Sequence, residues 1–250
     1  MKPFLLIPAR MESTRFPGKP LAKISGKPMI ERVYEACIGV SSISGCAVCT
    51  DSEEIINFCK SRKMDVVRTG SHSTGTDRVL EAAEALRVES VVNVQGDEPL
   101  ISSRFLDEFV SAFTEKQSSS SADDLIQASY CSATNEESLD KNVVKCLISR
   151  KSESVSFSRL PVCSAIVNGV ACYYKQIGVY AYSIDALKRF GGLGKSALEE
   201  CEKIELMRWI DYIAPVPMYR SAYPAYSVDT IEDLIKVERL IEHGASGRLS

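Results

Sequence analysis

The 250-residue sequence is poor in histidine, with only His72 and His243, and it has one tryptophan. So few histidines argue against a zinc site built from cysteine and histidine, and we expect any metal to bind oxygen ligands. The nine cysteines are an odd number, and those in CAVCT and VVKCLI lie among apolar neighbours. This pattern predicts buried, reduced thiols and argues against a disulfide framework.

Long apolar and long basic runs are also lacking. The apolar stretch in MKPFLLIPAR is too short for a signal-peptide core or a transmembrane helix, so we expect a cytoplasmic protein that does not bind membranes. Lys and Arg total 30 against 33 Asp and Glu, a formal net charge of -3, with no basic run suited to a phosphate backbone. We expect no nucleic-acid partner.

The sequence does contain short β-rich runs that alternate with longer amphipathic stretches. Apolar spacing and start signals predict strands at 4–7, 46–50, 64–68 and 91–94, and helices at 28–40, 52–61 and 77–86. This βαβαβ order indicates an α/β fold with a mostly parallel sheet and helices on both faces.

The regularity weakens after residue 115, where EKQSSSSADD predicts a solvated loop. Beyond it IQASY, VVKCLI, GVYAYSI and APVPMY are strand candidates, and 197–212 and 231–243 have helical patterns. The length suits a single domain over 1–250. Within it, we expect the segment from about 135 to 225 to form a smaller lobe.

A glycine-containing basic loop, PARMESTRFPGKPLAKISGKPMI, follows the first predicted strand. Small residues let backbone N–H groups approach phosphate oxygens, and Arg10 and Lys19 supply positive charge against a triphosphate. Composition alone also allows an ordinary basic surface loop. However, ligands of open α/β sheets bind at the carboxyl ends of strands, where this loop lies. It matches neither the P-loop nor GxGxxG, so a kinase or dehydrogenase lacks its expected signature.

Two aspartates are candidate metal ligands. Asp97 follows the buried-looking strand of VVNVQGDEPL, and Asp229 in YSVDTIED precedes a helical pattern. Mg²⁺ is usually bound by one or two carboxylates together with substrate phosphates. The alternatives are an ordinary turn for Asp97 and a helix N-cap for Asp229.

A third cluster, STGTDRVLE, contains Gly75, Thr76 and Arg78 at the start of a predicted helix. Backbone amides at such a position can face a ligand. Arg78 has an alternative role, a surface ion pair with Asp77 or a nearby glutamate.

Together these segments resemble the CMP-sugar-acid synthetases, and among them the 3-deoxy-manno-octulosonate (KDO) cytidylyltransferases. The motifs IPARMESTRFPGKPL, GKPMI, CTDSEEI, STGTDRVLE, VVNVQGDEPLI, FSRLP, IGVYAY and SVDTIEDL occur in the family order over nearly the whole chain. The resemblance implies a Rossmann-like, GT-A-like nucleotidyltransferase fold and a homodimer with a dimerisation lobe. It also implies transfer of CMP from CTP to a 3-deoxy-2-keto sugar acid for lipopolysaccharide synthesis.

The same resemblance assigns roles to individual residues. Asp97 and Asp229 would bind Mg²⁺, with Lys19 and Arg10 as further catalytic groups on the triphosphate. Nucleotide-binding positions are Pro8, Ala9, Arg10, Ser13, Thr14, Arg15, Lys19, Gly75, Thr76, Arg78 and Gln95. Sugar-binding positions are Arg78, Gln95, Gln176, Tyr180 and Glu205.

The sequence departs from the family at two expected sugar positions, with Gln176 in place of His and Leu206 in place of Gln. An apolar side chain at 206 removes a hydrogen-bonding group, so sugar contacts must differ. KDO is the leading candidate, and amino-substituted KDO or a nonulosonic acid is the alternative. Two further alternatives are a UTP- or dTTP-dependent enzyme acting on a neutral sugar phosphate and a relative that binds nucleotide without turnover.

Overall fold

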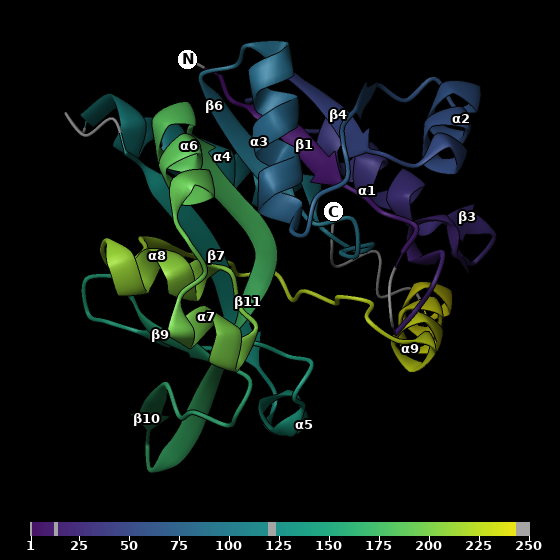
Figure 1. Ribbon diagram of the computed structural model, residues 1–250. Coiled ribbons are helices and arrows are strands. Elements are labelled where there is room, and N and C mark those ends of the chain that lie inside the picture. Colours follow the sequence, from purple (N-terminus) through teal and green to yellow (C-terminus); the bar gives the residue numbers. More distant parts are fainter. Residues whose placement is uncertain (1, 13–14, 120–123, 244–250) are drawn as a thin grey trace.

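The computed structural model describes residues 2–12, 15–119 and 124–243. Its main sheet has the strand order β12-β7-β11-β6-β1-β4-β5, and β8, β9 and β10 extend it beside β11 (Figure 1). β6, β1, β4 and β5 run parallel, as do β12 and β7, whereas β11 is antiparallel to both of its neighbours. The path strands are β1 (Phe4–Pro8), β4 (Gly45–Thr50), β5 (Val66–Arg68), β6 (Ser90–Val94), β7 (Ile126–Ala133), β11 (Val170–Ser183) and β12 (Met218–Arg220).

Helices cover both faces of this sheet, and strand side chains alternate between them. On β1, Leu5 and Ile7 pack into one apolar cluster while Leu6 packs into the other. The first cluster lies beneath α1 (Met29–Ile38), α2 (Glu53–Ser61) and α4 (Ser103–Ser119); the second lies beneath α3 (Gly75–Leu86), α6 (Ile184–Gly192) and α8 (Leu206–Tyr212). The mostly parallel α/β fold predicted from the sequence is therefore confirmed.

The cysteines follow the same alternation. Cys46 and Cys49 on β4 have the Cys-x-x-Cys spacing, but they pack into opposite clusters because residues three apart on a strand face opposite sides. All nine cysteines are free thiols; burial is confirmed for six of them and wrong for Cys163, Cys172 and Cys201.

Three sequence predictions for the second half need correction. Part of EKQSSSSADD is helical, because α4 continues to Ser119; positions 120–123 lie outside the described residues. The helix predicted over 197–212 is two helices, α7 (Ala197–Glu202) and α8, since Lys203 adopts a left-handed φ of 57° that ends α7. The strand in APVPMY shortens to β12, with its first residue at Met218.

Much of the segment from 135 to 225 lies in the lower part of the view in Figure 1, while its helix α6 lies higher, against α3. It holds α5 (Asn135–Leu139), β8 (Lys145–Ile148), β9 (Ser154–Ser158) and β10 (Ala165–Val167) beside the first half of β11. The second half of β11 pairs with β6 of the parallel sheet. β11 therefore runs from α5, β8, β9 and β10, which are hereafter called the lobe, into the parallel part of the sheet.

The C-terminal helix α9 (Ile231–Glu242) packs against the loop after β1. Ile24, Met29, Leu100, Val228 and Val237 form a third apolar cluster there. Glu238 of α9 accepts a hydrogen bond from the Ser25 N–H at 2.7 Å. This packing brings the N-terminal loop next to the segment that carries Asp229.

A buried ion pair fixes the angle between α7 and α8. Arg208 Nε and Nη2 donate to the two carboxylate oxygens of Glu199, at 2.8 and 2.7 Å, and both side chains are buried. We expect Arg208→Met to lower the free energy of unfolding by about 3–5 kcal/mol, because an unpaired carboxylate stays buried. Arg68→Met, which removes the exposed pair with Glu53, should cost about 0–1 kcal/mol. Urea denaturation measures both, and equal losses would contradict the assignment.

Candidate functional site

Two adjoining cavities open where β1 and β6 end. The first, the loop cavity, has a volume of about 240 Å³ and lies between the loop after β1 and the N-terminus of α3. The second, the lobe cavity, has about 280 Å³ and extends from the end of β6 to the lobe. Both are lined by Gln95, Asp97, Glu205 and Asp229. The two predicted metal ligands therefore lie at the junction of the cavities.

The predicted site residues gather around these cavities. Ser13 and Thr14 lie outside the described residues. The predicted residues that line the loop cavity are Pro8, Ala9, Arg10, Arg15, Lys19, Gly75, Arg78, Gln95, Asp97, Glu205 and Asp229. Those that line the lobe cavity are Thr76, Gln95, Asp97, Gln176, Tyr180, Glu205 and Asp229.

Lys19 bridges the carboxylate pair formed by Asp97 and Asp229. Its ammonium nitrogen lies 2.7 Å from Asp97 Oδ2 and 3.3 Å from Asp229 Oδ1, and it donates to the Val228 carbonyl at 2.9 Å. Burial lowers the pKa of Lys19, but the two carboxylates raise it by more, so the net shift is upward. Lys19 therefore holds a positive charge between the two carboxylates.

The carboxylate pair also fits a divalent cation. Since one nitrogen contacts both side chains, a single ion can reach an oxygen of each. Among the described residues no cluster of three or more His, Cys, Asp or Glu side chains forms a metal site. Further ligands for a bound ion would come from phosphate oxygens and water, as is usual for Mg²⁺.

Backbone contacts fix the segment that carries Asp229. The Val228 N–H donates to the Asp97 carbonyl at 2.9 Å. Asp233 accepts from the Asp229 and Thr230 N–H groups, while Thr230, not Asp229, is the N-cap of α9. The N-cap alternative for Asp229 is therefore wrong, and its carboxylate instead faces the cavities, where Lys19 and Arg15 contact it.

Arg15 connects the N-terminal loop to the lobe across the junction. Its Nη1 donates to Asn142 Oδ1 at 2.7 Å, and its Nη2 donates to Asp229 Oδ1 at 3.0 Å. The side chain is half exposed, so these bonds can exchange for ligand contacts. Asn142 was not among the residues identified from the sequence.

The N-terminus of α3 borders the loop cavity. Gly75 lies beside Gln95, and a Cβ added to it would be in van der Waals contact with the Gln95 amide nitrogen at 3.4 Å. Arg78 is buried and binds Thr69, the Gly70 carbonyl and Asp51. The surface ion pair with Asp77 or a glutamate is therefore wrong; Arg78 instead fixes the loop that precedes Gly75.

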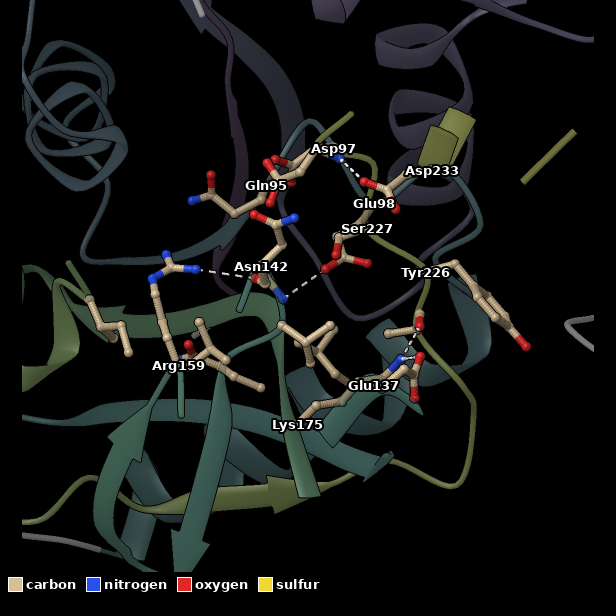
Figure 2. Close-up of a pocket in the computed structure, with 18 of the residues that line it drawn as sticks. Gln95, Asp97, Glu98, Glu137, Asn142, Arg159, Lys175, Tyr226, Ser227 and Asp233 are labelled. Carbon is tan, nitrogen blue, oxygen red and sulfur yellow. Dashed lines mark hydrogen bonds and ion pairs between the residues drawn. The ribbon is translucent and has the colours of Figure 1, made fainter. Parts of the chain in front are cut away.

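The lobe cavity separates the carboxylate pair from the lobe. Figure 2 shows Gln95 and Asp97 on one side, Arg159, Glu137 and Lys175 on the opposite side, and Asn142 between them. Lys175 is buried and donates to the Glu137 carboxylate and, at 2.7 Å, to the Ala225 carbonyl. Lys175 thus ties the lobe to the chain that leads to Asp229.

The two residues that differ from the family pattern, Gln176 and Leu206, both line the lobe cavity. Gln176 Nε2 is buried without a hydrogen-bond partner, and Leu206 is 3% exposed. Glu205, which precedes Leu206, is partly exposed, but desolvation of its carboxyl raises the pKa, while a hydrogen bond with Thr76 lowers it. The cavity therefore offers one unpaired amide and an apolar side chain at these positions.

A β-bulge in β11 shapes the wall of the lobe cavity. The register of β11 against β7 shifts between Ile177 and Tyr180. At the bulge a Cβ on Gly178 would lie 2.9 Å from Gln95 Cβ and 3.1 Å from Glu98 Oε1, so only glycine fits. Glu98 is not among the site residues predicted from the sequence. Burial, and next the Asp97 charge, raise the pKa of Glu98 to about 7.

A family model described as Cytidylyltransferase matches residues 4–218. The chain belongs to the cytidylyltransferase family. The 3-deoxy-manno-octulosonate cytidylyltransferase of Desulfatibacillum aliphaticivorans is 35% identical over 97% of this chain and 99% of its own length. That of Geobacter metallireducens is 34% identical over 95% of this chain and 96% of its own. The family resemblance predicted from the sequence is confirmed.

Solved structures agree with this membership. A CMP:2-keto-3-deoxy-manno-octonic acid synthetase complexed with CTP has a TM-score of 0.87 and 29% identity, covering 97% of this chain and 99% of its own. A UDP-glucose pyrophosphorylase has a TM-score of 0.69 at 15% identity, covering 98% of this chain and 100% of its own, a likeness of fold alone. The chain is therefore a cytidylyltransferase-family nucleotidyltransferase.

None of the helices in the described part of the chain combines the length and the apolar character that a membrane span requires.

Proposed function

We propose that the protein transfers CMP from CTP to the anomeric hydroxyl of KDO, releasing pyrophosphate for lipopolysaccharide synthesis. The observation that carries this proposal is the carboxylate pair at the junction of two cavities, one bordered by a basic loop and the other by polar side chains. The names of the relatives and the CTP complex of the similar synthetase support it.

In this proposal the nucleotide lies in the loop cavity and the sugar in the lobe cavity. The sugar hydroxyl attacks the α-phosphorus as the bond to the departing pyrophosphate breaks. Arg10 and Lys19 offset the charge on the pyrophosphate, and the α3 N-terminus at Gly75 lies beside the nucleotide. Mg²⁺ held by Asp97 and Asp229 would lower the pKa of the attacking hydroxyl and neutralise charge on the α-phosphate.

We include a homodimer and a cytoplasmic location in the proposal. The hairpin of β10 and β11 exposes Ile166, Val167 and Val170, which are 74%, 54% and 63% exposed. Figure 1 shows this hairpin projecting from the lobe. Such clustered apolar side chains are typical of a protein interface, and light scattering of the purified protein measures the assembly directly.

Substrate preference tests the proposal. We expect the purified enzyme to release pyrophosphate from CTP when KDO and Mg²⁺ are present. Replacing CTP by UTP or dTTP should give a much lower rate. The same assay with amino-substituted KDO and nonulosonic acids tests whether Gln176 and Leu206 change the sugar preference. Each hydrogen bond that a sugar acid loses in the cavity costs about 0.5–1.5 kcal/mol of binding free energy. Preference for an amino-substituted acid would replace KDO as the substrate. CTP binding without turnover on any sugar acid would favour a binding protein instead.

A further inference from the structure

Glu98 is a buried carboxylate that the proposed chemistry leaves without a role. It follows Asp97 at the end of β6 and is 3% exposed. Its Oε1 accepts a hydrogen bond from the Gly178 N–H at 3.0 Å, whereas its Oε2 has no hydrogen-bond partner. Leaving a buried polar atom unpaired is costly, so such an atom requires an explanation.

Unpaired polar atoms concentrate at the lobe cavity. Among the described residues five buried side-chain atoms lack a hydrogen-bond partner, and three of these belong to residues that line this cavity: Glu98 Oε2, Gln176 Nε2 and Glu205 Oε2. Two are acceptors and one is a donor. A hydroxyl group can pair with either kind of atom, because it both donates and accepts.

The position of the Glu98 carboxylate is fixed. Gly178 lies on the bulge of β11, and its carbonyl accepts from the Gln95 N–H at 2.8 Å. Its own N–H holds Glu98 Oε1, so a rotation of the carboxylate would break that bond. Oε2 is therefore preorganised at a constant place relative to Asp97, the next residue along the chain.

We propose that Glu98 binds the sugar acid by accepting a hydrogen bond from one of its hydroxyl groups on Oε2. The contact positions the sugar relative to Asp97 and discriminates against sugar acids that lack that hydroxyl. This inference depends on the proposed function, because the lobe cavity must hold the sugar. Glu98 would thus be a specificity residue beside Gln176 and Glu205.

The variant Glu98→Gln tests this role with little change of volume. Its amide oxygen can still accept from Gly178, but an NH₂ group replaces the acceptor Oε2. We expect the KM for the sugar acid to rise about 10- to 100-fold, as for a lost hydrogen bond to a charged group, and the KM for CTP to stay within about twofold. Glu108→Gln makes the same chemical change outside both cavities and should alter neither KM.

A panel of singly deoxygenated sugar acids separates binding from structure. The analogue that lacks the hydroxyl bound by Glu98 should bind the wild-type enzyme more weakly than the full sugar acid does. The Glu98→Gln variant should bind this analogue and the full sugar acid equally, because both changes remove the same hydrogen bond. Glu98→Asp, which withdraws the acceptor by one methylene, should also raise the sugar KM. An unchanged sugar KM in these variants, or an equal rise for CTP, overturns the assignment of Glu98. A wild-type enzyme inactive on every sugar acid contradicts the proposed function itself.

Discussion

Asp97→Asn is expected to abolish most turnover while leaving the fold intact. Metal stabilisation of a transition state supplies several kcal/mol, which corresponds to a loss of kcat of about 10²- to 10⁴-fold. The substitution keeps the side-chain volume, and the backbone bond from Val228 N–H to the Asp97 carbonyl remains. Pyrophosphate release measures the rate, and circular dichroism reports the fold.

Asp229→Asn should behave alike, and the double variant should be scarcely slower than either single one. Both carboxylates contact one nitrogen, that of Lys19, and would serve one ion, so the effects are not independent. Asp211→Asn changes an exposed carboxylate on α8 and should retain full activity. Additive losses in the double variant would refute a shared metal.

Lys19→Ala is expected to act on nucleotide and metal in opposite directions. Loss of the ammonium should lower kcat/KM for CTP about 10- to 100-fold, since a hydrogen bond to a charged group contributes about 1.5–3 kcal/mol. Without nucleotide, the carboxylate pair loses its resident cation and should bind Mn²⁺ more tightly than in the wild type. Steady-state kinetics and electron paramagnetic resonance of Mn²⁺ measure the two effects.

Lys23→Ala is the matched control, because Lys23 is an exposed lysine of the same loop that lines neither cavity. It should change neither CTP kinetics nor Mn²⁺ affinity. Normal rate and CTP affinity in Lys19→Ala would place Lys19 outside the nucleotide site. Weaker Mn²⁺ binding would show that Lys19 supports the carboxylates instead of competing for them.

The parallel half of the fold was predictable because its signals are local. β1 and β4 are almost entirely apolar, as expected of strands buried on both faces, and Ser52 caps α2, the helix predicted to begin there. The lobe was less predictable, since its strands are paired through β11. The helical pattern over 197–212 was also misread, because Lys203 divides it by adopting a left-handed conformation. Propensity does not encode such long-range pairing.

The site was predicted unevenly for the same reason. Asp97 and Lys19 belong to motifs at strand ends, where chemistry is expected, and they lie together in the structure. The role of Glu98 depends on a bulge at Gly178, about 80 positions away along the chain, and that of Asn142 on Arg15. Neither contact leaves a pattern in the local sequence.

The bond between the Val228 N–H and the Asp97 carbonyl has a consequence for biosynthesis. The first four strands of the parallel sheet are complete once the ribosome has passed Val94, but Asp229 emerges 135 residues later. Until then Lys19 has only one carboxylate to bind. Domains begin to fold during synthesis from the N-terminus, so a nascent chain can hold a folded parallel sheet for many seconds before it acquires the second carboxylate.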